Sequence, residues 1–264
     1  MEHDASAVGI RLLLFTTDPP LAGRAVAAGI DGLVVDLERR GKERRQRNAD
    51  TEINADTVED LSRLASVPAA LRVCRLNAWG PWSPGEVDGA IGHGATHLLL
   101  PMVRRTGEVE AALKAVNGRC PLGILVETRD ACARAPELAR LPLALVYVGL
   151  NDLAIDRGSA SIFDAVADGT VERLREAFGR IPFGFGGLTV VDGGRPVPCA
   201  LLLAEMARLA CSFSFLRRSF KRDIVGRDMA GEIALVRARW ASLRSRSPEQ
   251  VASDHAALIR VLAG

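Results

Sequence analysis

Residues 121–152 read PLGILVETRDACARAPELARLPLALVYVGLND, and they contain the unit that repeats along the whole chain. Two continuous apolar runs, within 121–128 and 143–150, are separated by a segment, 129–141, that has apolar residues at helical spacing. Short apolar runs that alternate with helical segments are typical of parallel strands buried on both faces. An acidic residue follows each run, Glu127 after the first and Asp152 after the second. The stretch therefore predicts two successive strand–helix units.

Six further apolar runs have the same relation to a following helical pattern, at 8–16, 32–38, 70–77, 96–103, 181–189 and 211–219. Eight strand–helix units in 264 residues predict an α/β protein with a single closed (β/α)8 TIM barrel. Neither G-x-G-x-x-G after the first run nor G-x-x-x-x-G-K-[ST] occurs, which argues against an open nucleotide-binding sheet. We expect the barrel to span residues 1–225. Residues 226–264 are expected to form a C-terminal helical extension that packs on the barrel or on a neighbouring subunit.

The composition is that of an ordinary soluble protein, with 48% hydrophobic and 25% charged residues. Because 34 basic residues nearly balance 32 acidic ones, no strong overall field attracts a polyanion. Five scattered cysteines without a C-x-x-C pair argue against a disulfide framework and a structural zinc site. The first 20 residues lack the basic segment of a signal peptide, and their apolar run is too short to span a membrane. We expect a cytoplasmic protein with no membrane partner.

Active sites of barrels of this type lie at the carboxyl ends of the strands. The polar residues predicted to lie there are Asp36, Glu38, Arg75, Asn77, Glu127, Thr128, Asn151, Asp152, Thr189, Arg217, Arg218 and Ser219. Acids and arginines from different strands are thus expected to face one common mouth.

Glu127 and Asp152 follow consecutive strands, so their carboxylates are expected to lie close together. Two ionised carboxylates side by side repel each other, and a divalent cation relieves that repulsion. Mg²⁺ is commonly held by one or two carboxylates, with water and substrate oxygens in its other positions. The alternative is that each acid caps the following helix or pairs with an arginine.

Three arginines near the predicted mouth have two interpretations each. Arg75 interrupts an apolar strand, where a guanidinium needs an anionic partner. That partner is either a substrate or a neighbouring acid, Asp36 or Glu38. Arg217 and Arg218 end the eighth strand and suit a carboxylate or phosphate, or else an ion pair or a subunit contact.

The segment ERRGKERRQRNADTE, residues 38–52, follows the second strand as a long loop on the catalytic face. Five arginines and one lysine between Arg39 and Arg47 raise the possibility of nucleic-acid binding. The segment has no aromatic residue for base stacking, and Glu43, Asp50 and Glu52 dilute its charge. We favour a mouth loop that grips an anionic substrate, with Arg39 among its contacts, or that seals a subunit contact. A plain solvated loop is the remaining alternative.

Five segments occur in a recognisable order: GLVVDLE (32–38), CRLN (74–77), HLLLPMV (97–103), GILVET (123–128) and VGLNDLAID (148–156). This ordered set resembles the aldolase / citrate lyase β-subunit family, TIM barrels of the phosphoenolpyruvate/pyruvate type. The resemblance implies a lyase or aldolase, dependent on Mg²⁺ or Mn²⁺, that acts on a 2-oxo acid through a metal-stabilised enolate. It implies Glu127 and Asp152 as metal ligands and Arg75 as the arginine that holds the substrate carboxylate or enolate.

The chain departs from the family at two motifs. Arg39 stands where citrate lyase-like members have a second aspartate, and no histidine follows the second strand as in the small aldolases. Glu38 is the remaining candidate for proton transfer, and Asp36 lies beside it for substrate binding. The substrate is a small anion, either a free 2-oxo acid or a CoA thioester.

Three functions follow, in order of preference. The first is the metal-dependent carbon–carbon lyase, the second is a lyase or hydrolase of acyl-CoA thioesters on the same metal site, and the third is a non-catalytic barrel that binds an anion or RNA. Nucleic acid is the less favoured partner. The resemblance also implies a homo-oligomer, a trimer or a hexamer.

Overall fold

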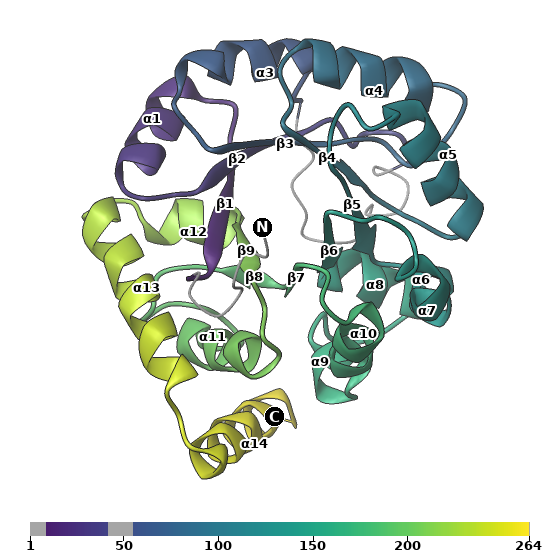
Figure 1. The fold of residues 1–264 in the computed structure, drawn as a ribbon. Coiled ribbons are helices and arrows are strands. Elements are labelled where there is room, and N and C mark those ends of the chain that lie inside the picture. Colours follow the sequence, from purple (N-terminus) through teal and green to yellow (C-terminus); the bar gives the residue numbers. More distant parts are fainter. Residues whose placement is uncertain (1–8, 42–54, 264) are drawn as a thin grey trace.

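The computed structural model describes residues 9–41 and 55–263. Parallel strands form one sheet in the order β7-β6-β5-β4-β3-β2-β1-β9-β8, and this sheet curves into a barrel (Figure 1). The strands are β1 (Arg11–Phe15), β2 (Gly32–Asp36), β3 (Leu71–Arg75), β4 (His97–Leu100), β5 (Leu122–Val126), β6 (Leu145–Val148), β7 (Phe183–Phe185), β8 (Gly187–Leu188) and β9 (Phe213–Leu216).

The barrel closes through β7 and β8, which are two halves of one predicted strand. Gly186 separates them with a φ of 56°, a left-handed conformation that glycine adopts without strain. The first half pairs with β6 and the second half pairs with β9, so the two ends of the sheet meet here. The amide of Ser212 also donates to the Phe183 carbonyl at 2.9 Å. The predicted (β/α)8 barrel is confirmed, with its seventh strand interrupted at one residue.

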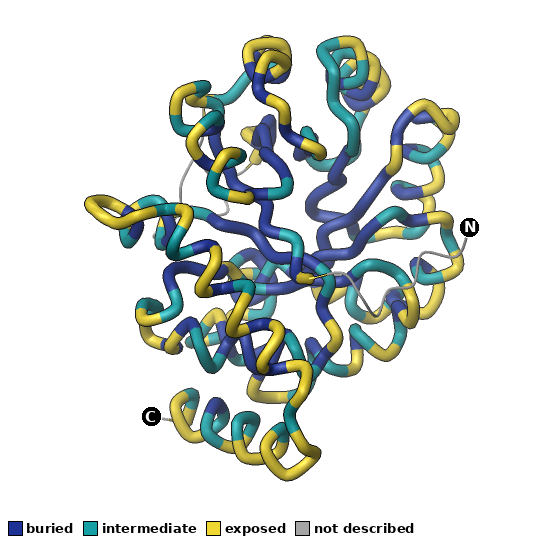
Figure 2. The backbone as a smooth tube through the Cα atoms, turned by 60° about the vertical axis from the view of Figure 1, so that its left-hand side comes forward, coloured by how far each residue is buried: buried dark blue, intermediate teal, exposed yellow. Residues whose placement is uncertain are grey.

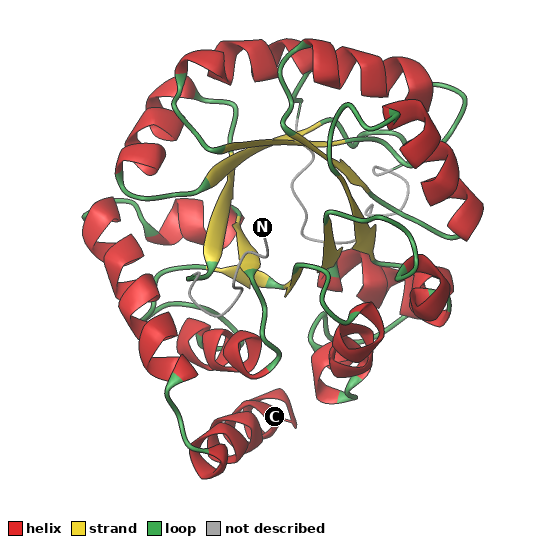
Figure 3. Ribbon diagram, in the orientation of Figure 1, coloured by secondary structure: helices red, strands yellow, loops and turns green. Residues whose placement is uncertain are grey.

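Helices surround the sheet on its outer side (Figure 3). They are α1 (Pro19–Ala27), α3 (Val58–Arg63), the 3₁₀ helix η1 (Leu64–Ser66), α4 (Ser83–Gly92), α5 (Thr106–Val116), α6 (Arg129–Ala133), α7 (Ala135–Leu138), α8 (Leu150–Arg157), α9 (Asp164–Ala167), α10 (Thr170–Phe178), α11 (Cys199–Arg208), α12 (Arg218–Asp223), α13 (Met229–Arg244) and α14 (Pro248–Ala263). Side chains of Asp18 and Thr128 cap the first turns of α1 and α6, as these residue types do at helix starts. No helix among the described residues is both long enough and apolar enough to cross a bilayer.

Alternating side chains of each strand divide the core into two layers. One layer fills the barrel with residues such as Phe15, Val34, Val73, Leu125 and Phe215, and the other packs the strands against the helices. Both faces of the strands are therefore buried, as the dark tube in Figure 2 shows.

The inward alternation continues past the last apolar side chain of each strand. Counting two residues on from Val34, Val73, Leu125 and Phe215 places four charged residues toward the barrel mouth. They are Asp36, Arg75, Glu127 and Arg217. Strand period and parallel topology thus bring these side chains to one end of the barrel.

The two C-terminal helices pack on the helices of the barrel. Trp240 of α13 is buried, and the Arg237 guanidinium donates to the carbonyls of Ile10 and Gly29 at the base of the barrel. Helix α14 lies against α11, where His255 Nδ1 is 3.0 Å from a Glu205 carboxylate oxygen. Figure 1 shows α14 at the edge of the molecule. A domain boundary near residue 226 stays a prediction.

Candidate active site

The mouth of the barrel contains a buried ion-pair cluster formed by β2 and β3. Asp36 and Arg75 lie directly opposite each other in the strand register, and both are buried. Arg75 donates from Nε and Nη2 to the two Asp36 oxygens, at 2.7 and 2.6 Å. Its Nη1 lies 3.4 Å from Oε2 of Glu38, which is also buried. Of the two interpretations of Arg75 from sequence, the ion pair with neighbouring acids is present in the structure.

Glu127 extends from the end of β5 into the same region. Its Oε1 accepts a hydrogen bond of 2.8 Å from the Met102 amide, which follows β4. Met102 has a φ of 55°, an uncommon left-handed conformation for a residue with a side chain. A Cβ atom at Gly149 would lie 2.3 Å from Oε2, so only glycine leaves room for the Glu127 carboxylate. Backbone from both neighbouring strands thus fixes this acid.

Asp152 lies in the first turn of α8, and it is 8% exposed. Burial raises the pKa of Glu127 most, and the carboxylates of Asp152 and Glu38 raise it further, to about 8. The Arg75 guanidinium and the Met102 amide oppose that rise only in part. Sequence predicted that Glu127 and Asp152 lie close together and hold a metal ion, and their role as metal ligands stays a prediction.

These acids fit a divalent cation. Asp36, Glu38 and Glu127 are buried near the Arg75 guanidinium, and the buried Asp152 acts on Glu127, so added positive charge would stabilise the ionised forms of these acids. Among residues 9–41 and 55–263, no group of three or more acids, histidines or cysteines is arranged so that it could hold a metal ion. Two carboxylates with oxygens from water and substrate are the donor set that suits Mg²⁺. Glu127 and Asp152 are the residues that could hold it.

The side chains of Arg217 and Arg218 have different surroundings in the structure. The Arg217 guanidinium lies over the Phe15 ring, 4.6 Å from its centroid, and the Arg75 guanidinium lies 5.4 Å from the same ring. Phe15 belongs to the layer inside the barrel, so Arg217 faces the mouth. Arg218 begins α12 and is exposed. The predicted pair therefore supplies one arginine to the mouth, because Arg217 directly follows β9 whereas Arg218 is the first residue of α12.

The loop after β2 is anchored at both described ends. Amides of Arg39 and Arg40 each donate to Oδ1 of Asn77 at 2.9 Å, and Asn77 in turn donates to the carboxylate of Glu86. The Arg40 guanidinium lies 4.5 Å over the Trp82 ring. These contacts fix the chain that immediately follows Glu38.

The Arg39 side chain donates to the backbone carbonyl of Asp56 at the other end of the loop. Asp56 also accepts from the Asp36 amide at 3.0 Å, and burial is the main cause of its raised pKa. Arg39 thus contacts the backbone of the protein itself, where sequence suggested a contact with the substrate. Arg44, Arg45 and the rest of segment 42–54 lie outside the described residues.

Sequence reasoning missed Met102, Gly149 and Asp56. The signals were slight: a methionine two residues after β4, a glycine directly after β6, and an acid two residues before α3. Their roles depend on contacts between strands, which a single sequence does not display. Asn77 was predicted at a strand end, and the structure gives it the role of holding a loop.

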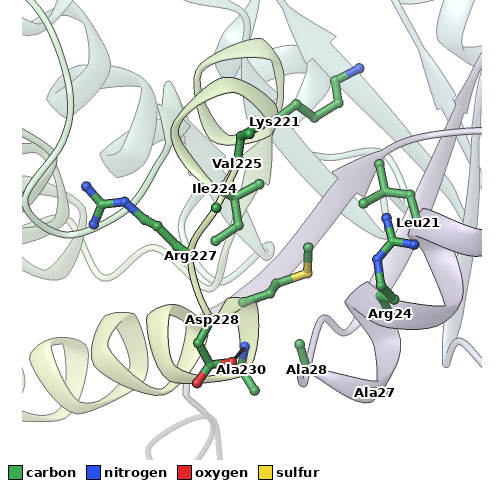
Figure 4. A pocket seen from close by; sticks show the side chains of 12 residues that line it. Leu21, Arg24, Ala27, Ala28, Lys221, Ile224, Val225, Arg227, Asp228 and Ala230 are labelled. Carbon is green, nitrogen blue, oxygen red and sulfur yellow. Dashed lines mark hydrogen bonds between the residues drawn. The ribbon is translucent and has the colours of Figure 1, made fainter.

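A surface cavity of about 710 Å³ lies away from this cluster, between α1 and the turn from α12 to α13 (Figure 4). Leu21 and Arg24 line one side, and Ile224 and Val225 line the other. None of the acids or arginines of the mouth lines it. It is therefore separate from the candidate active site.

Comparison with known proteins agrees with the barrel. No family model and no curated protein sequence matches the chain. Among solved structures, RipC from Yersinia pestis is 15% identical, with a TM-score of 0.59, and the match covers 92% of this chain and 98% of RipC. The citrate synthase SbnG is 16% identical, with a TM-score of 0.59 and coverage of 89% and 93%.

CitE from Mycobacterium tuberculosis, solved in complex with magnesium and pyruvate, is 18% identical. Its TM-score is 0.58, and the match covers 96% of this chain and 98% of CitE. This chain shares their TIM-barrel fold. The TIM-barrel fold implied by the ordered sequence motifs is therefore confirmed, and CitE is among the proteins that have it.

Proposed function

We propose that the protein is a Mg²⁺-dependent carbon–carbon lyase or aldolase that acts on a 2-oxo acid. One observation carries this proposal: at the mouth of a TIM barrel, the buried Glu127 carboxylate lies beside the Arg75 cluster and is acted on by a second buried carboxylate, that of Asp152. Buried acids of like charge are costly unless a cation joins them. The general lyase type is supported by neighbours of the same fold, which include a citrate synthase and CitE.

The residues of the mouth have separable tasks in this reaction. Glu127 and Asp152 would hold the ion, which when bound polarises the oxygens of a 2-oxo acid and stabilises negative charge as a carbon–carbon bond breaks. The Met102 amide and the space at Gly149 orient the Glu127 carboxylate before substrate arrives. Burial of these groups excludes water, which strengthens their electrostatic effect on the substrate.

Glu38 is the candidate for the proton-transfer group. Its Oε2 lies within 3.4 Å of the Arg75 guanidinium, and its amide donates to Oδ1 of Asp36 at 3.2 Å. A carboxylate so placed could take up a proton from the substrate at Oε2 and return it to the carbon that becomes carbanionic. Asp36 holds the Arg75 guanidinium in position through both of its oxygens.

Calorimetric titration of Mg²⁺ into the protein, with and without pyruvate, tests the proposal. We expect pyruvate to tighten Mg²⁺ binding, and we expect Glu127→Gln and Asp152→Asn to abolish that effect. Asp130→Asn is the matched control, because Asp130 is half-exposed and pairs with Arg104 and Arg134 on the rim. Absence of Mg²⁺ binding to the unmodified protein, with or without pyruvate, would rule out the proposed function.

A further inference from the structure

The outer side of α13 is apolar although it faces solvent. Leu235, near the middle of this helix, is 56% exposed, and Ala234 and Ala238 beside it are exposed as well. The other side of α13 packs against α1 and α11, and Ile233 and Trp240 are buried there. Figure 1 shows α13 at the edge of the molecule. A helix that covers a barrel is usually polar on its outer side, so an apolar outer side is typical of a contact surface.

A hollow of about 450 Å³ lies on this side of α13, next to Leu235. Small residues form much of its lining, which consists of Asp228, Gly231, Glu232, Ala234, Leu235 and Ala238. Asp228 also lines the cavity of Figure 4, so the apolar surface continues to Val225, which is 77% exposed. A protruding leucine and a hollow beside it thus share one face of the protein.

The spacing of the residues on this face suits a second helix. Asp228, Gly231, Leu235, Ala238 and Ser242 follow one another at intervals of three and four residues, the spacing of a helix–helix seam. If a second copy of α13 lay across this seam, Leu235 of each copy could enter the hollow of the other. Both hollows are filled at once only when the two copies are related by a twofold axis.

The charges along α13 favour an antiparallel arrangement of the two copies. Near its start, the acids Asp192, Asp228 and Glu232 outnumber Arg227, which pairs with Asp192 and Glu232 at 2.9 Å. Arg239 lies seven residues after Glu232, so it is on the same side of the helix. It is exposed, and no hydrogen bond or ion pair joins it to another residue among 9–41 and 55–263. Antiparallel helices set the acids of each copy against Arg239 of the other, whereas parallel helices would set like charges side by side.

We infer that the outer side of α13 is the surface at which two copies of this chain pair about a twofold axis, with their α13 helices antiparallel. This surface lies outside the barrel mouth, and the inference does not depend on the proposed function. The family resemblance implied a trimer or a hexamer without indicating a surface. A twofold contact joins copies in pairs, so it gives a dimer or links two trimers into a hexamer.

Sedimentation equilibrium of the full chain over a wide range of concentration measures the dissociation constant of the pair. We expect Leu235→Glu to raise that constant by about a hundredfold or more, because each pair would lose two buried leucines and gain two buried carboxylates. Val261→Glu is the matched control, since Val261 is a 40% exposed apolar residue of α14, away from this surface. It should change the constant by less than about threefold.

Arg239→Glu tests the antiparallel arrangement. It should raise the dissociation constant by roughly tenfold at low salt, and by less at high salt, because the new carboxylates would face the acids of the other copy. Arg244→Glu makes the same charge change at another exposed position of α13. Arg244 is about two and a half helical turns from Leu235, hence on the opposite side of the helix, and its substitution should have little effect.

Each outcome decides the inference. An unmodified protein that is monomeric at every concentration overturns it, and so does an assembly of any size that Leu235→Glu disturbs no more than Val261→Glu does. Conversion of a hexamer to trimers by Leu235→Glu supports it. Equal effects of Arg239→Glu and Arg244→Glu overturn the antiparallel arrangement, and they decide against the inference if Leu235→Glu does not fold. Mg²⁺ binding enters none of these outcomes, so the proposed function keeps its own test.

Discussion

Adding one methyl group at Gly149 should disable the candidate metal site without touching a charged residue. Gly149 has φ −81° and ψ 88°, which alanine adopts without backbone strain. The new Cβ would lie 2.3 Å from Glu127 Oε2 and 3.0 Å from the Glu127 Cβ. The steric conflict is therefore with the proposed metal ligand and not with the backbone of Gly149.

The size of the effect follows from these distances. Ordinary contact with a Cβ begins at 3.4 Å, so the Glu127 carboxylate must move by about 1 Å or more in Gly149→Ala. Such a movement would also lengthen the hydrogen bond from the Met102 amide. Overpacking of this kind costs about 1–3 kcal/mol of stability. Displacement of a metal ligand typically costs roughly tenfold to a hundredfold in affinity, as removal of its supporting contacts does.

Calorimetry of Mg²⁺ binding and urea unfolding measure the two effects of Gly149→Ala. Gly187→Ala is the matched control, because the nearest atom to its Cβ would be the Phe215 carbonyl oxygen at 3.6 Å, an ordinary contact. We expect the control to bind Mg²⁺ as the unmodified protein does. An unchanged Mg²⁺ affinity in Gly149→Ala would refute the reasoning that this glycine makes room for a metal ligand.

Four further predictions follow, two on the pH dependence that Glu127 causes and two on other parts of the molecule. Below its pKa of about 8, Glu127 holds a proton that Mg²⁺ must displace. The apparent affinity of the protein for Mg²⁺, measured by calorimetry, should therefore rise by up to roughly tenfold per pH unit as the pH approaches 8, and it should level off above pH 8. Without Mg²⁺, the folded state holds the Glu127 proton more tightly than the unfolded state does, so the free energy of unfolding should fall as the pH rises from 4.5 towards 8. Urea titrations of Glu127→Gln should show no such fall. Asn77→Ala should lower stability by about 2–4 kcal/mol, since it leaves two loop amides and one carboxylate oxygen without their partner; a loss below about 0.5 kcal/mol would contradict that role. Arg237→Met should cost about 1–2 kcal/mol in the same assay, because it removes the link from α13 to Asp31 and to two carbonyls at the base of the barrel.

The amino-acid sequence determined the fold because its signals are local. Continuous apolar runs followed by helical patterns encode strands covered on both faces, and eight of them leave few alternatives to a barrel. Their positions at the ends of apolar runs also predicted that Asp36, Arg75 and Glu127 lie at the mouth, since polar residues at the carboxyl ends of barrel strands face it. The break at Gly186 was not predicted, because the run 181–189 reads as one strand.

Tertiary structure alone decided what these residues contact. Arg75 binds Asp36 because the register of β2 and β3 sets them opposite each other, and register is a relation between distant segments. Met102 positions the Glu127 carboxylate with its backbone amide, and Gly149 leaves space for that carboxylate because it has no Cβ atom. Neither contribution depends on the kind of side chain that a sequence pattern would reveal. Arg217 was separated from Arg218 by the direction of the chain where it leaves β9 for α12. Local patterns specify which residues reach the mouth, but partners there are set by packing between strands that are far apart in the sequence.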